Sequence, residues 1–210
     1  MKILSIDPSA ISMGWAFLKD GEIIDVGFIP PLEGVNHGAR YGEAWLWLKK
    51  MIQIYKPDLL LFEDYFFASK FAAGASVSVE LRGVLKLCAF NHAIDYTMID
   101  PAKWKRILLY SVVDKLTGKE YTRVKSDKGK IIKWRKILRK KYGKLKAKKM
   151  ITVLALELLG CACPKKIRNP KTGNMIKFRY DISDALGILV AYLIENKIKY
   201  KFDIKWNLIP

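Results

Sequence analysis

The 210 residues of this chain suit one domain, and they are enough to bury a full hydrophobic core. Lysine and arginine total 38 against 20 acidic residues, which gives a formal net charge of +18. This charge favours a polyanionic partner, nucleic acid first of all, and argues against a small neutral substrate.

The first part of the chain is predicted to form strands before it forms a helix. Apolar runs predict three strands, and the Asp20-Gly21 dipeptide between the last two is a two-residue hairpin signal. Apolar residues at helical spacing follow over residues 38–55, until Pro57 ends the pattern. The three predicted strands comprise residues 3–7, 13–19 and 22–28.

Strands and helices then alternate. The continuous apolar run at residues 59–63 is typical of a strand that is covered on both faces, and residues 96–99 form a further predicted strand. Antiparallel hairpins followed by alternating helix and strand predict a mixed α/β sheet. Further helices are predicted at residues 75–92, 147–159 and 181–196.

Two strongly basic segments interrupt this order. Residues 114–144 are dominated by Lys and Arg, and the expected structure is a hairpin followed by a basic helix at residues 130–142. A run of charge is usually a solvated face or a disordered tail. Trp134 and Tyr142 lie among these lysines, however, and that combination suits stacking on unpaired bases. A second basic loop covers residues 165–179.

Four acids stand where predicted apolar elements begin or end. Asp7 and Glu63 end strands, while Asp181 and Asp184 open a helix and share one face of it. Taken singly, Asp181 and Asp184 suit a helix N-terminus, and Asp7 suits the cap of a turn. Glu63 is harder to explain in this way, because an unpaired charge at the end of so apolar a strand is costly to bury. Together the four carboxylates predict a cation site.

The available ligands favour a hard cation. Carboxylate oxygens suit Mg²⁺ or Mn²⁺, whereas zinc prefers His and Cys. His37 and His92 flank helices and are expected at the surface or in caps, although His37 also suits contact with a phosphate. Two hard cations about 4 Å apart activate a water and stabilise the leaving oxygen in phosphodiester hydrolysis. The three cysteines lack CxxC spacing and predict neither a disulfide framework nor a zinc site: Cys88, Cys161 and Cys163.

Three segments resemble the motifs of RuvC-type Holliday junction resolvases, in the family's order and spacing. They are Ile-Leu-Ser-Ile-Asp-Pro-Ser at residues 3–9, Leu-Phe-Glu-Asp-Tyr-Phe at residues 61–66 and Asp-Ile-Ser-Asp-Ala-Leu at residues 181–186. Gly14 and residues 146–159 extend the resemblance over most of the chain outside the basic segments. It implies a ribonuclease H-like fold, with a mixed five-stranded sheet flanked by helices, and a homodimer that cuts four-way DNA junctions. It also implies two Mg²⁺ or Mn²⁺ ions in each active site. The basic elaborations resemble those of a phage or viral member.

The resemblance also implies roles for individual residues. Asp7, Glu63, Asp181 and Asp184 match the metal-binding catalytic acids. Phe66 matches an aromatic residue placed against bases at the junction centre, and a position in an aromatic core explains it nearly as well. The other expected DNA contacts are Lys105, Lys146, Lys148, Trp134, Arg135 and Arg139.

The helix predicted at residues 75–92 carries two apolar stripes. A helix that is apolar on two sides is either fully buried or lies at an interface. One stripe suits packing on the sheet. Because the chain is long enough for only one domain, a second copy of the chain is expected to cover the other stripe. The second stripe is therefore expected to form a dimer interface through Val79, Gly83, Leu87 and Phe90.

We therefore expect a single ribonuclease H-like domain over residues 1–210, with basic insertions at residues 114–144 and 164–180. The expected function is a metal-dependent endonuclease that resolves four-way junctions by paired nicks. The alternatives are a nuclease for flaps or RNA–DNA hybrids on the same fold, and a non-catalytic protein that binds branched DNA. The sequence shows neither a secretory signal nor an apolar run near the ~20 residues that span a bilayer. A cytosolic protein without a membrane partner is expected, in a bacterium or an infected host cell.

Overall fold

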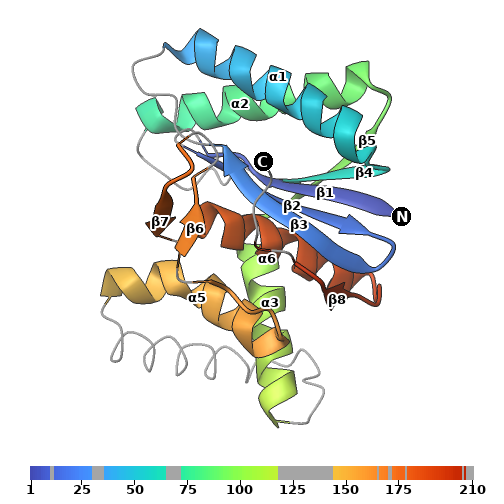
Figure 1. The fold of residues 1–210 in the computed structure, drawn as a ribbon, viewed down its shortest axis with the longest axis vertical. Coiled ribbons are helices and arrows are strands. Elements are labelled where there is room, and N and C mark those ends of the chain that lie inside the picture. Colours follow the sequence, from blue (N-terminus) through green and yellow to red (C-terminus); the bar gives the residue numbers. More distant parts are fainter. Residues whose placement is uncertain are drawn as a thin grey trace.

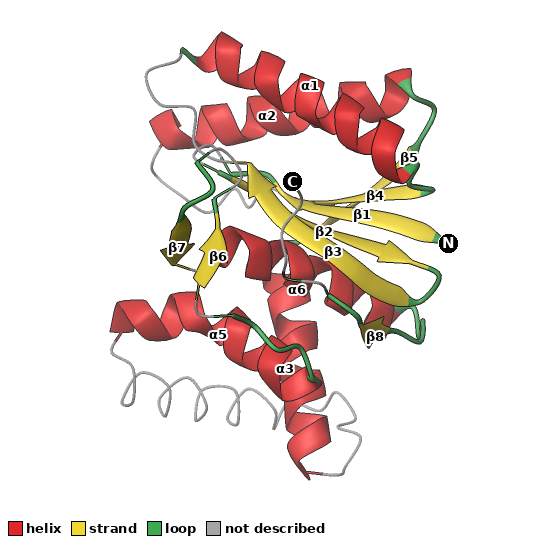
Figure 2. Ribbon diagram, in the orientation of Figure 1, coloured by secondary structure: helices red, strands yellow, loops and turns green. Residues whose placement is uncertain are grey.

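A mixed six-stranded sheet forms the centre of the fold (Figures 1 and 2). The computed structural model describes residues 1–9, 12–29, 36–64, 72–117, 144–164, 166–169, 172–177, 179–204 and 206. The sheet has the order β5-β4-β1-β2-β3-β8. Its strands are β1 (Lys2–Asp7), β2 (Met13–Lys19), β3 (Glu22–Ile29), β4 (Leu59–Glu63), β5 (Asp95–Ile99) and β8 (Lys201–Phe202).

The five strands expected from the sequence are confirmed. β8, which has only two residues, adds a sixth strand at the edge of the sheet beside β3. β1, β2 and β3 form an antiparallel meander, whereas β4 and β5 run parallel to β1. The hairpin signal between β2 and β3 is also confirmed, since Asp20 and Gly21 both have positive φ angles, as a two-residue turn with a right-handed strand twist requires. β8 is too short to show a pattern in the sequence.

Helices cover both faces of the sheet. They are α1 (His37–Tyr55), α2 (Ala72–Asn91), α3 (Pro101–Thr117), α5 (Lys144–Leu159) and α6 (Tyr180–Glu195). α1 and α2 lie together on one face, α6 lies on the other, and α3 and α5 pack against α6 from outside (Figure 1). Among the described residues, no helix is both long and apolar enough to cross a bilayer.

The alternation of side chains along β1 divides the core into two clusters. Ile3 belongs to the cluster beneath α6, whereas Leu4 and Ile6 belong to the cluster beneath α1 and α2. With a period of two, Ser5 and Asp7 must face the α6 side. The Ser5 hydroxyl does donate to the carbonyl oxygen of Ala185 in α6, at 2.9 Å. Asp7 therefore ends β1 on the side where α6 begins.

Besides β8, neither helix α3 nor the ribbon of β6 and β7 was expected from the sequence. α3 begins at Pro101, and the Asp100 carboxylate caps it by accepting from the Lys103 amide at 2.7 Å. An Asp-Pro start is a helix signal, but lysines and arginines in and beyond the helix obscured its apolar side. The second basic segment, expected to be a loop, contains the two-stranded ribbon β6 (Lys166–Arg168) and β7 (Met175–Lys177). The basic helix expected at residues 130–142 lies outside the described residues.

The start of α6 lies directly on β2. A Cβ atom built at Gly14 would overlap the carbonyl group of Asp181 and lie 2.6 Å from the backbone nitrogen of Ile182. Gly14 is also the cross-strand partner of Asp7. Only glycine permits this close approach, and the approach brings the first turn of α6 against the end of β1.

We expect Gly14→Ala to lower the free energy of unfolding by about 3 kcal/mol, because the added methyl group meets backbone and not a side chain that can move. Gly42→Ala is the matched control: Gly42 lies within α1, and a Cβ atom there meets nothing within 4 Å. That change should stabilise the protein by about 0.5–1 kcal/mol. Chemical denaturation measures both, and equal effects would show that the contact between β2 and α6 is not tight.

Candidate active site

The four acids that the sequence singles out come together at one edge of the sheet. β1 and β4 are parallel neighbours, so their last residues, Asp7 and Glu63, end at the same edge. The docking of α6 on β2 adds Asp181 and Asp184 from the first turns of the helix. Two strands and one helix, far apart in the sequence, thus assemble one acidic cluster.

Asp7 is the most strongly perturbed of the four acids. Its side chain is buried, with 8% exposure, and burial raises its pKa well above the usual value. The charges of Glu63, Asp184 and Asp181 raise that pKa further, in this order, and the Lys105 ammonium opposes them. Each of the other three acids thus lies close enough to Asp7 to repel its charge.

Asp184 has its pKa raised to about 6, first of all by burial. The Lys105 ammonium and a hydrogen bond from the Thr152 hydroxyl favour its charged form, whereas Glu63 and Asp181 disfavour it. Thr152 is itself buried in α5. One neutral donor and one cation thus stabilise the charged form of Asp184.

Glu63 is held by donors from two helices. The indole Nε1–H of Trp104 in α3 donates to Oε1 at 2.9 Å, and the Lys105 ammonium lies 3.5 Å from the same oxygen. Trp104 is fully buried. Lys105 also lies 4.5 Å from the centre of the Trp104 ring. Arg82 of α2, buried at 7% exposure, donates through Nε to the carbonyl oxygen of Glu63 at 2.7 Å, and its Nη2 is 3.9 Å from Oε2.

Asp181 is held by Arg179, the residue immediately before α6. Arg179 donates from Nε and Nη2 to the same oxygen, Oδ2, at 3.2 and 2.9 Å. Arg179 is the N-cap residue of the helix, and its backbone is extended. The Arg179 guanidinium therefore supplies positive charge on one side of Asp181.

The donor chemistry of the cluster fits a hard divalent cation, since four carboxylates that repel one another offer only oxygen ligands. In the part of the chain that the structure describes, no three Asp, Glu, His or Cys side chains converge closely enough to hold a metal ion. Instead, Arg179 pairs with Asp181, while Trp104 and Lys105 engage Glu63. Lysine and arginine side chains of the protein thus supply positive charge that stabilises these carboxylates.

The other predicted site residues have different outcomes. Lys105 lies at the acidic cluster, with its ammonium 3.5 Å from Glu63 Oε1, and its contact with DNA stays a prediction. Lys146 and Lys148 belong to the first turns of α5. His37 begins α1, and His92 follows α2 with Nδ1 at 2.9 Å from the carbonyl oxygen of Cys88. The remaining predicted DNA contacts lie outside the described residues: Phe66, Trp134, Arg135 and Arg139.

The predicted dimer stripe lies on the surface of α2. Val79, Leu87 and Phe90 are 42%, 55% and 79% exposed, and a Cβ atom at Gly83 would meet nothing within 4 Å. The stripe is accessible to a partner.

Sequence reasoning singled out Lys105, as a DNA contact, but not the other residues that hold the acids: Trp104, Arg82, Thr152 and Arg179. Arg82 offers a signal, because a lone arginine between apolar residues of a helix requires a buried partner. The sequence does not reveal the hydrogen bonds of Trp104 and Thr152, since each depends on how α3, α5 and α6 pack together.

No family model matches this chain, but its sequence is similar to those of named proteins. It is 28% identical over 114 residues to the crossover junction endodeoxyribonuclease RuvC of Gloeobacter violaceus, a match that covers 51% of this chain and 64% of that protein. The match to RuvC of Chloroflexus aurantiacus is 27% identical over 129 residues and covers 59% and 78% of the two chains. This chain is therefore similar to RuvC proteins over half of its length or more.

Solved structures agree with this relationship at the level of the fold. Thermus thermophilus RuvC in complex with a Holliday junction substrate matches with a TM-score of 0.60 at 13% identity, over 94% of this chain and 96% of that chain. Thermus thermophilus RuvC in a second structure gives a TM-score of 0.51. The ribonuclease H-like fold expected from the sequence motifs is confirmed.

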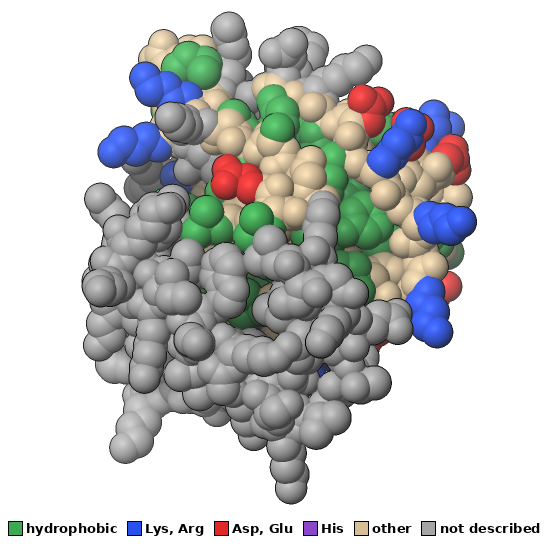
Figure 3. Space-filling view, turned by 90° about the horizontal axis from the view of Figure 1, so that it is seen from below, with side chains coloured by type: hydrophobic (Ala, Val, Ile, Leu, Met, Phe, Trp, Pro, Cys, Tyr) green, Lys and Arg blue, Asp and Glu red, His purple; other side chains and the backbone are tan. Residues whose placement is uncertain are grey.

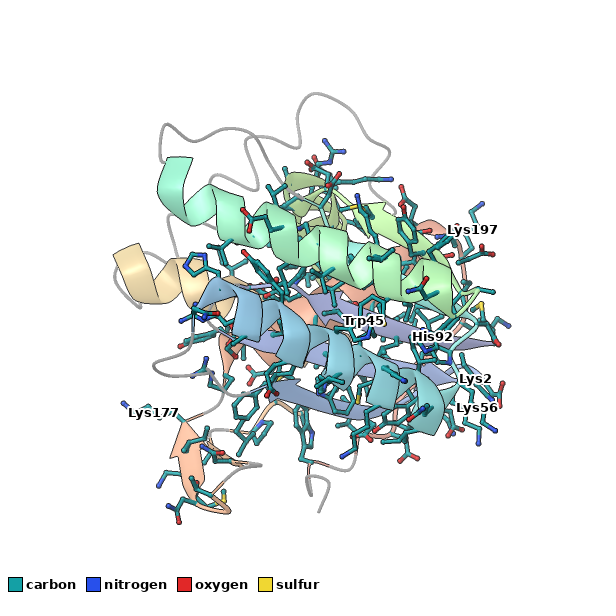
Figure 4. All side chains as sticks on the ribbon, turned by 90° about the horizontal axis from the view of Figure 1, so that it is seen from above. Lys2, Trp45, Lys56, His92, Lys177 and Lys197 are labelled. Carbon is teal, nitrogen blue, oxygen red and sulfur yellow. The ribbon has the colours of Figure 1, made fainter. Side chains whose placement is uncertain are left out.

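The hydrogen bond between Trp104 and Glu63 is testable by a double-mutant cycle. Trp104→Phe removes the indole donor and keeps most of the ring, and Glu63→Gln removes the charged acceptor. We expect a coupling free energy of about 1–3 kcal/mol, as for a hydrogen bond to a charged group. Trp45→Phe, on α1 across the sheet (Figure 4), is the control and should add to Glu63→Gln within about 0.5 kcal/mol. Additivity in both cycles would mean that Trp104 does not hold Glu63.

The raised pKa of Asp184 predicts a pH dependence of stability without added metal. The folded state binds the proton at a pKa of about 6 and the unfolded state near 3.8. Protonation of Asp184 in the folded state therefore stabilises the fold at low pH. This contribution to the free energy of unfolding is lost as pH rises from the unfolded-state pKa through the folded-state pKa of about 6. The difference corresponds to roughly 3 kcal/mol. Urea denaturation from pH 4 to 7 in EDTA should show a smaller loss for Asp184→Asn than for the wild type, and parallel curves would contradict the prediction.

Proposed function

We propose that this protein is a metal-dependent endonuclease that resolves four-way DNA junctions by paired nicks. The observation that carries the proposal is the acidic cluster that α6 completes at the end of β1, in a chain of net charge +18 that is similar to RuvC proteins. A positively charged protein has no structural need to gather four carboxylates, two of them with raised pKa values. Gathering them makes sense when their task is to bind cations beside a polyanion.

Asp7, Glu63, Asp181 and Asp184 are the proposed ligands of two divalent cations, Mg²⁺ or Mn²⁺. Ions bound there supply the charge that activates a water and stabilises the leaving 3′ oxygen. To ligate through Oδ2, Asp181 must give up its pair with Arg179, because that oxygen accepts both guanidinium hydrogen bonds. An Arg179 guanidinium freed in this way would carry its positive charge next to the DNA backbone.

The surrounding residues have separate tasks in this proposal. Trp104 and Arg82 fix the orientation of Glu63, and Thr152 fixes Asp184. Lys105 is 40% exposed although it lies beside the acids, so its ammonium can reach a phosphate that enters the site. Lys146 and Lys148 are proposed to contact the DNA backbone, together with the residues outside the described structure, Phe66, Trp134, Arg135 and Arg139.

The proposed active form is a homodimer. A junction is resolved by two cuts in strands of like polarity, and two sites related by a two-fold axis match the symmetry of the junction. Three exposed apolar side chains on α2 support this interface: Val79, Leu87 and Phe90. Gly83 lies among them and allows close approach of two helices. The three thiols are free, which suits a reducing compartment such as the cytosol of a bacterium or an infected host cell.

The test is a cleavage assay with four-way junctions, flaps, RNA–DNA hybrids and linear duplexes in Mg²⁺. We expect paired nicks in the four-way junction. We also expect that Asp7→Asn, Glu63→Gln, Asp181→Asn and Asp184→Asn each abolish them while junction binding persists, because phosphate contacts supply the affinity. Asp95→Asn, an exposed acid at the start of β5, is the control. Preferred cleavage of flaps or RNA–DNA hybrids would favour the alternative nuclease. Binding of branched DNA without cleavage would favour the non-catalytic protein.

The dimer interface is tested by Leu87→Glu, which places a charge in the apolar stripe of α2. We expect a dimeric wild type and a monomeric variant that binds junctions weakly and makes uncoupled single nicks. Leu46→Glu is the matched control, because Leu46 is 61% exposed on the neighbouring helix α1. Sedimentation decides between the outcomes: a monomeric wild type, or a Leu87→Glu variant that remains dimeric, would show that this interface is wrong.

A further inference from the structure

The ribbon formed by β6 and β7 is attached to the core by only one of its faces. Its middle pair consists of Ile167, which is 1% exposed, and Ile176, which is partly buried, and both pack on the cluster beneath α6. In the pair next to it, Lys166 and Lys177 lie directly opposite each other, and both are exposed. Side chains of adjacent residues in a strand point to opposite faces. The two lysines therefore lie together on the outer face of the ribbon.

No negative charge of the ribbon offsets the repulsion between Lys166 and Lys177. Like charges directly across an antiparallel pair destabilise it. Neither Lys166 nor Lys177 forms an ion pair with any residue that the structure describes. The sequence contains no acid from residue 164 to 180, although it has six lysines and arginines there. The ribbon thus keeps a repulsive pair with no counter-charge of its own.

The main sheet treats charges on neighbouring strands differently. Lys2 and Lys19 also lie opposite each other, on β1 and β2, but Asp20 interacts with both of them. Glu22 of β3 and Lys201 of β8 lie opposite each other as an ion pair at 2.6 Å. In the main sheet, acids of the chain balance these lysines. No acid in the part of the chain that the structure describes balances the β6–β7 pair, which leaves this pair open to an anion from outside the chain.

The position of the ribbon indicates which anion it meets. β6 and β7 lie beside the start of α6, at the end of the molecule where the acidic cluster forms (Figure 1). Lys177 and Lys2 lie at opposite ends of the molecule (Figure 4). Arg179, two residues after Lys177, reaches Asp181. At the same end, basic side chains stand at the left edge of the surface in Figure 3, whereas acidic and basic side chains alternate at the right edge.

We propose that Lys166 and Lys177 bind backbone phosphates of the DNA next to the strand that is cut. The inference rests on the proposed function, because it takes the substrate of the acidic cluster to be DNA. Asp181 comes only four residues after Lys177, which ends β7, and Arg179 between them pairs with that acid. A DNA strand bound at the acids would therefore pass beside the ribbon. Phosphates between the two lysines replace their repulsion with two charge-assisted contacts.

The test compares two double variants in binding to a four-way junction in EDTA, where cleavage does not interfere. Lys166→Thr/Lys177→Thr keeps residues that favour strands and should lower the slope of log affinity against log salt by about 2, or about 1 for each lysine. Between about 50 and 200 mM salt, its affinity should fall roughly tenfold less than that of the wild type. Lys2→Thr/Lys19→Thr, the opposed pair at the other end, should leave the slope unchanged. Equal slopes for all three proteins, or equal losses in both variants, would overturn the proposal.

A charge reversal separates DNA binding from a structural role. Lys177→Glu places opposite charges across the ribbon, so amide hydrogen exchange in β6 and β7 should become slower while junction affinity falls below that of Lys177→Thr. Faster exchange, or undiminished affinity, would mean that the lysines do not serve DNA. A wild type that binds junctions with the expected slope but cleaves nothing would refute the proposed nuclease and leave this inference standing. A wild type that cleaves while the ribbon variants keep its slope would refute the inference alone.

Discussion

Repulsion among buried carboxylates is the constraint on which this structure depends. Asp7 ends β1 beneath α6, and the helix can reach it only because Gly14 offers no side chain. That close approach brings Asp181 and Asp184 near Asp7 and Glu63, and the pKa of Asp7 rises as a result of burial and of these charges. This repulsion lowers the stability of the fold unless cations offset it. The cations are the protein's own lysines and arginines, metal ions or both.

The helices outside the sheet follow from this constraint. α3 and α5 cover α6, and they also bring Trp104, Lys105 and Thr152 to the acids. Gly187 of α6 is part of this packing, since a Cβ atom there would lie 2.6 Å from the Trp104 ring. The packing of α3 on α6 thus sets the position of Glu63 on β4. The first basic segment lies between the end of α3 and the start of α5, so the same two helices join it to the site.

Much of this arrangement follows from local sequence, and the rest depends on tertiary contacts. The strands and the acids at their ends could be predicted because apolar runs and their terminal charges are neighbours in the chain, and positive φ angles at Asp20 and Gly21 confirm the hairpin. The hydrogen bond from Trp104 could not, because it joins residues 41 positions apart. The β6–β7 ribbon escaped prediction because three residues in each strand are too few to show a pattern.

The most direct test of the account is a crystal structure grown with Mn²⁺ and measured at a wavelength where manganese scatters anomalously. The account predicts anomalous density beside Asp7, between the ends of β1 and β4 and the first turn of α6, with Asp181 turned from Arg179 toward the ion. Full occupancy of Mn²⁺ elsewhere, with none beside Asp7 and the pair of Arg179 with Asp181 intact, would contradict it.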